Sequence, residues 1–131
     1  MWTFKNVFAI GLFLFGTTFL WMTPAMAGKT PPPTGTAWTI TNILCFAAII
    51  GFSIAAWAVF KEYAWWETAA LLSAIVGLIA VVPFVVAQGQ LDVGFGDLGV
   101  QINLWLHILG SAAVIAVAVL PAVHDWVERR L

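Results

Sequence analysis

The chain has 131 residues, of which 63% are hydrophobic and only 8% are charged, and its formal net charge is −1. Soluble domains carry roughly 45–50% apolar and 25% charged residues, so this composition excludes a water-soluble fold and predicts that the lipid bilayer is the chain's solvent. The lack of a basic block excludes nucleic acid as a partner, because binding to DNA or RNA needs clustered Lys and Arg.

The distribution of apolar residues predicts the number of membrane crossings. A bilayer core of about 30 Å needs roughly 20 apolar residues in a helix that rises about 1.5 Å per residue. Four stretches meet this need, at residues 4–23, 37–60, 64–87 and 102–123. We therefore predict an all-α integral membrane protein, in which residues 1–131 form one domain: an antiparallel bundle of four transmembrane helices, followed by a tail at residues 124–131.

The first stretch is also a candidate signal peptide. Lys5 precedes an apolar run from Val7 to Met22, and Ala25-Met26-Ala27 has the A-x-A pattern that signal peptidase cuts. Against cleavage, the apolar run is long for a signal peptide and only one lysine precedes it. Both interpretations stay open, with four helices if residues 1–27 remain and three if they are removed.

The second and third stretches are predicted to pack as a hairpin. Residues 28–36 contain three consecutive prolines and form a loop, whereas residues 61–63 leave only a tight turn between the two helices. In lipid, small residues spaced four apart let helix backbones approach closely. We assign two such rows to packing within the monomer, with oligomerisation as the alternative: Ala47, Gly51 and Ala55, and Ala69, Ser73 and Gly77.

The fourth stretch is the most polar one. Asn103 and His107 lie one helical turn apart and therefore share a face. Pro83 removes a backbone hydrogen bond from the third helix, and the resulting bend is expected to open a pocket near the outer membrane surface. The predicted polar pocket contains Asn42, Gln88, Gln90, Asn103 and His107.

Two roles stay open for His107. A polar side chain inside a membrane commonly joins two helices, and Thr41 or Asn42 lies at a similar depth. The alternative is a cofactor role, in which the imidazole ligates haem b or hydrogen-bonds a quinone. His124 lies too far along the helix to share a haem with His107, so a second ligand would come from another chain. We expect no cofactor and keep haem b as the alternative.

Charged residues follow the fourth stretch. His124, Asp125, Glu128 and the two final arginines are predicted to form a solvated, salt-bridged helix end. Glu67, at the start of the third stretch, is expected to pair with Lys61 or with Arg129.

The positive charges predict the orientation. With four crossings, one side of the membrane receives Lys5, Lys61, Arg129 and Arg130, and the other receives only Lys29. The positive-inside rule then places both termini in the cytoplasm, at the cell membrane of a bacterium or archaeon.

The function has to be inferred without a catalytic signature. No nucleophile and base pair, phosphate-binding glycine motif or metal-spaced His and Glu cluster is recognisable in the sequence. We therefore expect a noncatalytic accessory or scaffolding subunit, whose partners are other membrane subunits or further copies of itself. The alternatives are a homo-oligomeric transporter or channel, and an electron-transfer subunit.

A secretion component is a further alternative. The A-x-A site followed by the small-residue hairpin at residues 37–87 loosely resembles conjugative pilins. The resemblance covers under half of the chain, and the additional helix at residues 102–123 departs from the two-helix pilin pattern.

Overall fold

The computed structural model describes residues 1–131 and contains helices joined by loops, with no strands. Its elements are α1 (Phe4–Thr18), two 3-10 turns η1 (Phe19–Met22) and η2 (Pro24–Met26), α2 (Thr36–Phe60), α3 (Trp66–Gly89), α4 (Leu98–Val119) and α5 (Pro121–Glu128). Four helical segments are long and apolar enough to cross a membrane, namely α1 together with η1, then α2, α3 and α4. The predicted all-helical membrane fold with four spans is confirmed.

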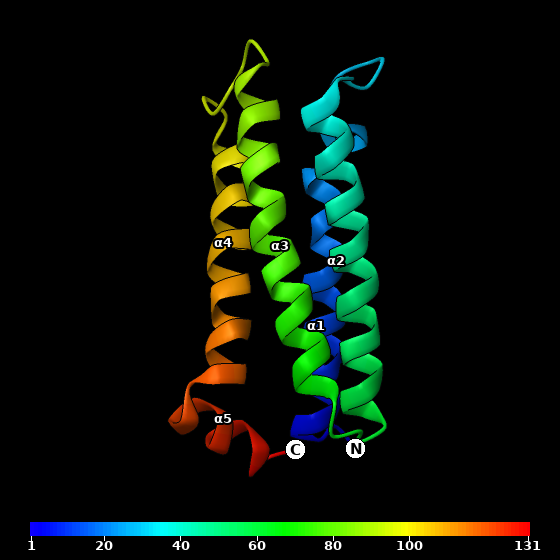
Figure 1. Cartoon of the computed structure of the whole chain (residues 1–131), viewed down its shortest axis with the longest axis vertical. Coiled ribbons are helices and arrows are strands. Elements are labelled where there is room, and N and C mark those ends of the chain that lie inside the picture. Colours follow the sequence, from blue (N-terminus) through cyan, green and yellow to red (C-terminus); the bar gives the residue numbers. More distant parts are fainter.

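The helices run up and down as an antiparallel bundle (Figure 1), in which both termini lie at one end, here called the terminal end. The opposite end, here called the loop end, carries residues 23–35 and 90–97. The largest interface joins α2 to α3, α1 packs against α2, and α4 packs mainly against α3. The short turn at residues 61–65 forces α2 and α3 to be neighbours, as the sequence predicted.

The core of the bundle combines bulky aromatic rings with small residues that make room for them. Phe19 and Phe52 are fully buried and their ring centroids lie 5.9 Å apart. A Cβ added to Gly77 would meet the Phe19 ring at 2.5 Å, so the ring fits only because α3 has a glycine there. Gly51 of α2 similarly faces Ser73 of α3 without space for a Cβ. Close packing of this kind stabilises helix pairs in lipid, where apolar burial alone gives little driving force.

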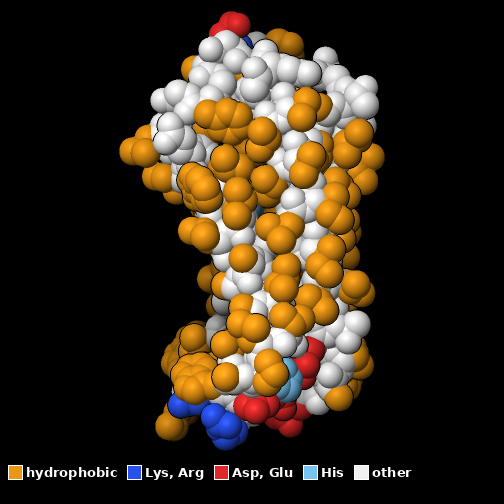
Figure 2. All heavy atoms as spheres, turned by 60° about the vertical axis from the view of Figure 1, so that its left-hand side comes forward, with side chains coloured by type: hydrophobic (Ala, Val, Ile, Leu, Met, Phe, Trp, Pro, Cys, Tyr) orange, Lys and Arg blue, Asp and Glu red, His pale blue; other side chains and the backbone are white.

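The surface of the bundle is apolar along its length. Figure 2 shows hydrophobic side chains over the middle of the molecule and most of the visible charged side chains at the terminal end. Large hydrophobic residues from every membrane-length helix are exposed, among them Phe13, Ile43, Leu72 and Leu109. An apolar girdle of this kind is what a bilayer requires of the surface that it contacts.

The end of the fourth helix differs from the prediction of residues 102–123. The helix begins at Leu98, where the Asp97 side chain accepts a hydrogen bond from the Gly99 backbone nitrogen at 2.6 Å, and it ends at Val119. Leu120 is extended and Pro121 starts a separate helix, α5. Proline disfavours helical backbone in the residue before it and is well suited to the first position of a helix. Pro121 thus ends α4, and α5 turns across the terminal end of the bundle (Figure 1).

Candidate functional site

His107 lies inside the bundle and bridges α4 to α1. The side chain is fully buried, with Nδ1 2.6 Å from the Asn103 carbonyl oxygen and Nε2 3.1 Å from the Thr18 hydroxyl. Because a carbonyl oxygen only accepts, the proton of the neutral imidazole is on Nδ1, and Nε2 accepts from the hydroxyl. The Thr18 hydroxyl also lies 2.5 Å from the Phe15 carbonyl oxygen, so its single proton serves two acceptors.

His107 does not bond to either of the partners expected from the sequence, Thr41 and Asn42. The hydrogen bond goes to Thr18 of α1, whereas the Thr41 hydroxyl donates to the Ala37 carbonyl within α2. The Phe19 ring lies edge-on with its centroid 4.5 Å from the imidazole centroid. With both ring nitrogens in hydrogen bonds and no exposed surface, His107 offers no free nitrogen to a haem iron in this arrangement, and its geometry fits the helix-joining role.

A cavity opens at the loop end of the bundle. Its volume is about 380 Å³, and its wall combines aromatic residues with polar ones from η1, α2, α3 and α4, including Trp21, Trp38, Phe84, Gln88 and Asn103. The structure thus brings together two of the five residues predicted for a polar pocket. The other three, Asn42, Gln90 and His107, do not line this cavity.

The two amides in this cavity have fixed orientations. Gln88 Nε2 donates to the Gly94 carbonyl at 2.7 Å, and Asn103 Nδ2 donates to the Trp21 carbonyl at 3.0 Å. Each amide holds a neighbouring segment, so both side chains act as ties between a helix and a loop or turn. Asn103 Oδ1 is buried without a hydrogen-bond partner.

The predicted small-residue rows lie only partly in helix interfaces. Ala55, Ser73 and Gly77 are buried and Gly51 faces Ser73, so these four lie where α2 and α3 or their neighbours meet. Ala69 is half-buried, and its carbonyl accepts a hydrogen bond from Ser73 Oγ at 2.6 Å. Ala47 is exposed, and Ala48 is the buried residue at this level of α2. The prediction from four-residue spacing is therefore wrong by one position at the start of the α2 row, where Ala48 is buried in place of Ala47.

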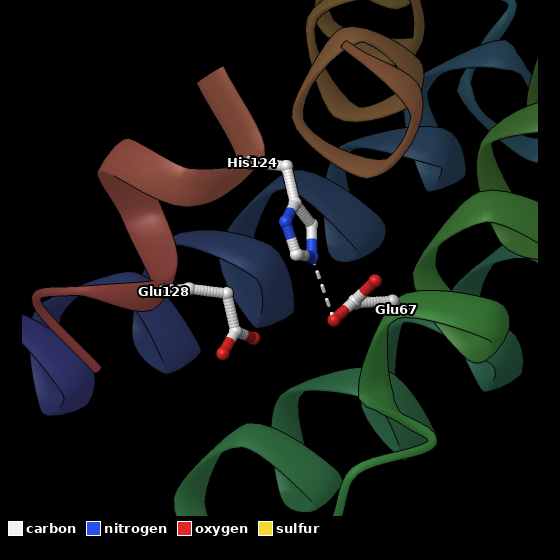
Figure 3. A group of neighbouring side chains, drawn as sticks. All are labelled: Glu67, His124 and Glu128. Carbon is white, nitrogen blue, oxygen red and sulfur yellow. Dashed lines mark ion pairs between the residues drawn. The ribbon is translucent and has the colours of Figure 1, made fainter. Parts of the chain in front are cut away.

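A cluster of ionisable side chains joins α5 to α3 at the terminal end. Figure 3 shows His124 and Glu128 of α5 beside Glu67, which lies in the first turn of α3. His124 Nε2 is 2.9 Å from a Glu67 carboxylate oxygen, and His124 Nδ1 is 3.4 Å from an Asp125 carboxylate oxygen. The expected pairing of Glu67 with Lys61 or Arg129 is not observed, because His124 takes that place.

Electrostatic effects follow from these pairings. The hydrogen bond that His124 donates to the Glu67 carboxylate, with a smaller contribution from Asp125, raises the pKa of His124 above its ordinary value, and partial burial opposes this rise. At the same end of the molecule the Lys5 ammonium donates to the Glu62 carboxylate and lowers the pKa of Glu62. That ion pair ties the start of α1 to the turn between α2 and α3.

The sequence analysis did not identify this three-residue cluster, although the spacing of two of its members could have indicated it. His124 and Glu128 are four residues apart and therefore adjacent on a helix, a spacing typical of metal ligands. Glu67 could be added only after the fold had brought α3 and α5 together.

Scans of protein-family models, of curated proteins and of solved structures each found no match to this chain.

Proposed function

We propose that this protein is a noncatalytic accessory or scaffolding subunit of a membrane complex. The observation that carries the proposal is an apolar groove between α1 and α4, against which a transmembrane helix of a partner would pack. The groove has a volume of about 350 Å³, and its walls include Val7, Gly11, Phe15, Gly110 and Val114.

The groove exists because α1 and α4 touch at few points. α4 packs mainly against α3, and it reaches α1 chiefly through Phe15, which lies against Gly110, and through the His107–Thr18 hydrogen bond. Gly11 has no atom within 4 Å of the place where its Cβ would be, so its backbone is open to the bilayer. Exposed glycine backbone next to branched side chains is the surface that favours close helix packing in lipid.

The use of polar groups inside the bundle supports a structural role. The imidazole of His107, the amide of Asn103 and the hydroxyls of Thr41 and Ser73 all bond to backbone or to a neighbouring helix. The bonds of His107 and Asn103 tie α4 to α1 and to η1, whereas those of Thr41 and Ser73 stay within their own helices. We place the terminal end of this scaffold in the cytoplasm, because four of the five Lys and Arg residues lie there.

The test is photo-crosslinking in the native membrane. A p-benzoylphenylalanine residue replaces Val7 in the groove, or Ile43 on the outer face of α2 as the matched control, since the two side chains are 54% and 62% exposed. After irradiation, a carboxyl-terminal tag retrieves the products for mass spectrometry. We expect one stoichiometric protein partner from position 7, and lipid adducts from position 43.

Two results would count against this function. Lipid adducts from both positions would mean that the groove holds only acyl chains, and the scaffold proposal would fall. Crosslinks from position 7 to a second copy of the chain alone would favour the homo-oligomeric transporter or channel instead. Solute flux into proteoliposomes that disappears in a Gln88→Ala variant would then identify the loop-end cavity as its entrance.

A further inference from the structure

The side-chain cluster at the terminal end points to a metal site. We propose that Glu67, His124 and Glu128 bind a divalent transition-metal ion of the Zn²⁺ type, which clamps α5 to α3. The proposal is independent of the scaffold function, since it concerns a different end of the molecule and would hold with or without a partner subunit.

The positions of the ligand atoms carry the proposal. One ligand atom from each of the three side chains lies within 4.8 Å of the other two. Donors that surround Zn²⁺ at about 2.0–2.2 Å in a tetrahedron are roughly 3.3–3.6 Å apart, so only a small contraction is needed. Glu128 is exposed and can supply this contraction by rotating its side chain.

The donor set selects the class of metal. One imidazole nitrogen and two carboxylates match the mixed nitrogen and oxygen ligands of Zn²⁺ sites with an open fourth position, which water would occupy. Ca²⁺ and Mg²⁺ prefer six or more oxygen ligands and use no imidazole, so they are expected to bind more weakly here.

The surroundings favour the same assignment. Asp125 Oδ1 lies 3.4 Å from His124 Nδ1, which is the place where metal-bound histidines usually meet an orienting carboxylate. No lysine or arginine forms an ion pair with Glu67 or Glu128. The Arg130 guanidinium instead stacks on Trp126, with its central carbon 3.8 Å from the ring centroid. In this site a cation would bind His124 Nε2 in the place of a proton.

Metal binding would fix the position of α5. Pro121 separates α5 from α4, so its orientation depends on the side chains that reach the rest of the bundle. His124 and Glu128 come from successive turns of α5, and Glu67 comes from the start of α3. An ion that bridges these three residues therefore joins the end of the chain to the central hairpin.

The experiment is a titration of the full-length protein in detergent after removal of metal with a chelator. Calorimetry with ZnCl₂ is expected to show one ion per chain, and CoCl₂ is expected to give the intense visible absorption of tetrahedral Co²⁺. Glu128→Gln should weaken Zn²⁺ binding at least about tenfold, in line with the effect of changing groups around metal sites. The Glu67–His124 pair stays intact in this variant, so its fold is preserved.

Further variants separate a specific site from adventitious binding. His124→Ala should abolish the Co²⁺ absorption and the rise in melting temperature that Zn²⁺ produces in the unmodified protein. Glu62→Gln removes a carboxylate at the same end of the molecule that lies outside the cluster, and it should bind Zn²⁺ normally. If Zn²⁺ bound equally to all of these proteins, or to none of them, the proposed site would be refuted.

Discussion

At the scale of single residues, the Thr18–His107 hydrogen bond is one of two polar contacts that join the first span to the last, and the other is the bond from Asn103 to the Trp21 carbonyl. Thr18→Val keeps the shape of the side chain and removes the hydroxyl, which leaves His107 Nε2 without its donor. We expect the free energy of unfolding to fall by about 0.6 kcal/mol and at most about 1.7 kcal/mol, the average and the maximum measured for hydrogen bonds between transmembrane helices. Denaturation of the purified protein in mixed micelles measures this change.

A matched change tests whether the hydroxyl itself is responsible. Thr18→Ser keeps the hydrogen-bonding group, so its stability should stay near that of the unmodified protein. Thr17 is next to Thr18, and its hydroxyl bonds only within α1, to the Leu14 carbonyl. Thr17→Val should therefore cost less than Thr18→Val, and the reverse order would show that the bond to His107 has little effect on stability.

The contact of Gly51 with Ser73 predicts a steric effect at the α2–α3 interface. Gly51→Ala places a methyl group against the Ser73 side chain, and overpacking of this kind costs about 1–3 kcal/mol. Gly11→Ala is the control, because nothing lies within 4 Å of its added methyl group. Thermal unfolding should separate the two variants, and a second change, Ser73→Gly, should restore much of the stability that Gly51→Ala loses.

The Lys5–Glu62 pair predicts a dependence on pH at the terminal end. Because Lys5 lowers the pKa of Glu62 in the folded protein, the pair stabilises the fold above the unfolded-state pKa of Glu62, and this contribution is lost as the pH falls through the lower folded-state value. Replacing Lys5 with Met should raise the pKa of Glu62 toward its ordinary value. A carboxyl-carbon NMR titration measures this shift.

Lys61 provides the control for that titration. It precedes Glu62 in the sequence but lies over the Trp57 ring, at 4.9 Å from the ring centroid. The pKa of Glu62 should therefore change less in Lys61→Met than in Lys5→Met. Equal changes in the two variants would mean that general positive charge acts on Glu62, without a specific pair.

The sequence allowed some of these contacts to be predicted and not others. Asn103 and His107 were found because helical spacing places them on one face. The predicted partner of His107 was wrong because Thr41 and Asn42 were chosen for their depth in the membrane, and depth does not determine which helix faces the imidazole. Glu67 was assigned to Lys61 or Arg129 on charge alone, whereas the break at Pro121 turns α5 so that His124 is the nearer group.

At the scale of elements, α1 with η1 behaves as part of the core. Phe19 is fully buried, whereas Phe13 of the same span is 47% exposed to the bilayer side. Phe19→Ala would leave a cavity on the order of 100 Å³, which at about 24 cal/mol per Å³ corresponds to roughly 2 kcal/mol. Phe13→Ala mainly removes contacts with lipid, so it should lower the free energy of unfolding far less.

Chemical or thermal denaturation of the two variants in the same detergent tests whether α1 with η1 is part of the packed core. A large loss of stability in Phe19→Ala alone would mean that removing residues 1–27 opens the core. Equal small losses would mean that the first span packs loosely, as expected for a segment that is later cleaved.

The boundaries of the helices show what hydropathy can and cannot predict. The number of spans follows from length and apolar content, because backbone groups in lipid must be bonded within a helix. The division between α4 and α5 was missed because the residues around Pro121 are nearly all apolar, so the hydropathy pattern continues while the backbone does not. A proline's effect on the residue before it is a local steric constraint that average hydropathy does not contain.

At the scale of the whole molecule, the distribution of charge predicts how the bundle sits in its membrane. The two termini and the turn after α2 share one end, which carries Lys5, Lys61, Arg129 and Arg130, and the loop end carries only Lys29. Insertion retains positively charged segments in the cytoplasm, and short loops such as these obey the rule most strongly. We therefore expect both termini to be cytoplasmic and the loop at residues 90–97 to be outside.

Reporter fusions in a bacterial host test this orientation. Green fluorescent protein fused after Leu131 should fluoresce, and alkaline phosphatase inserted after Gly94 should be active, because each reporter works on only one side of the membrane. The model with four spans requires the amino-terminal fusion to match the carboxyl-terminal one. Opposite sides for the two termini would mean that α1 does not span the membrane, and the groove between α1 and α4 would then lose one of its walls. An inverted pattern that keeps the termini together would leave the bundle intact and overturn only the assignment of the cytoplasmic face.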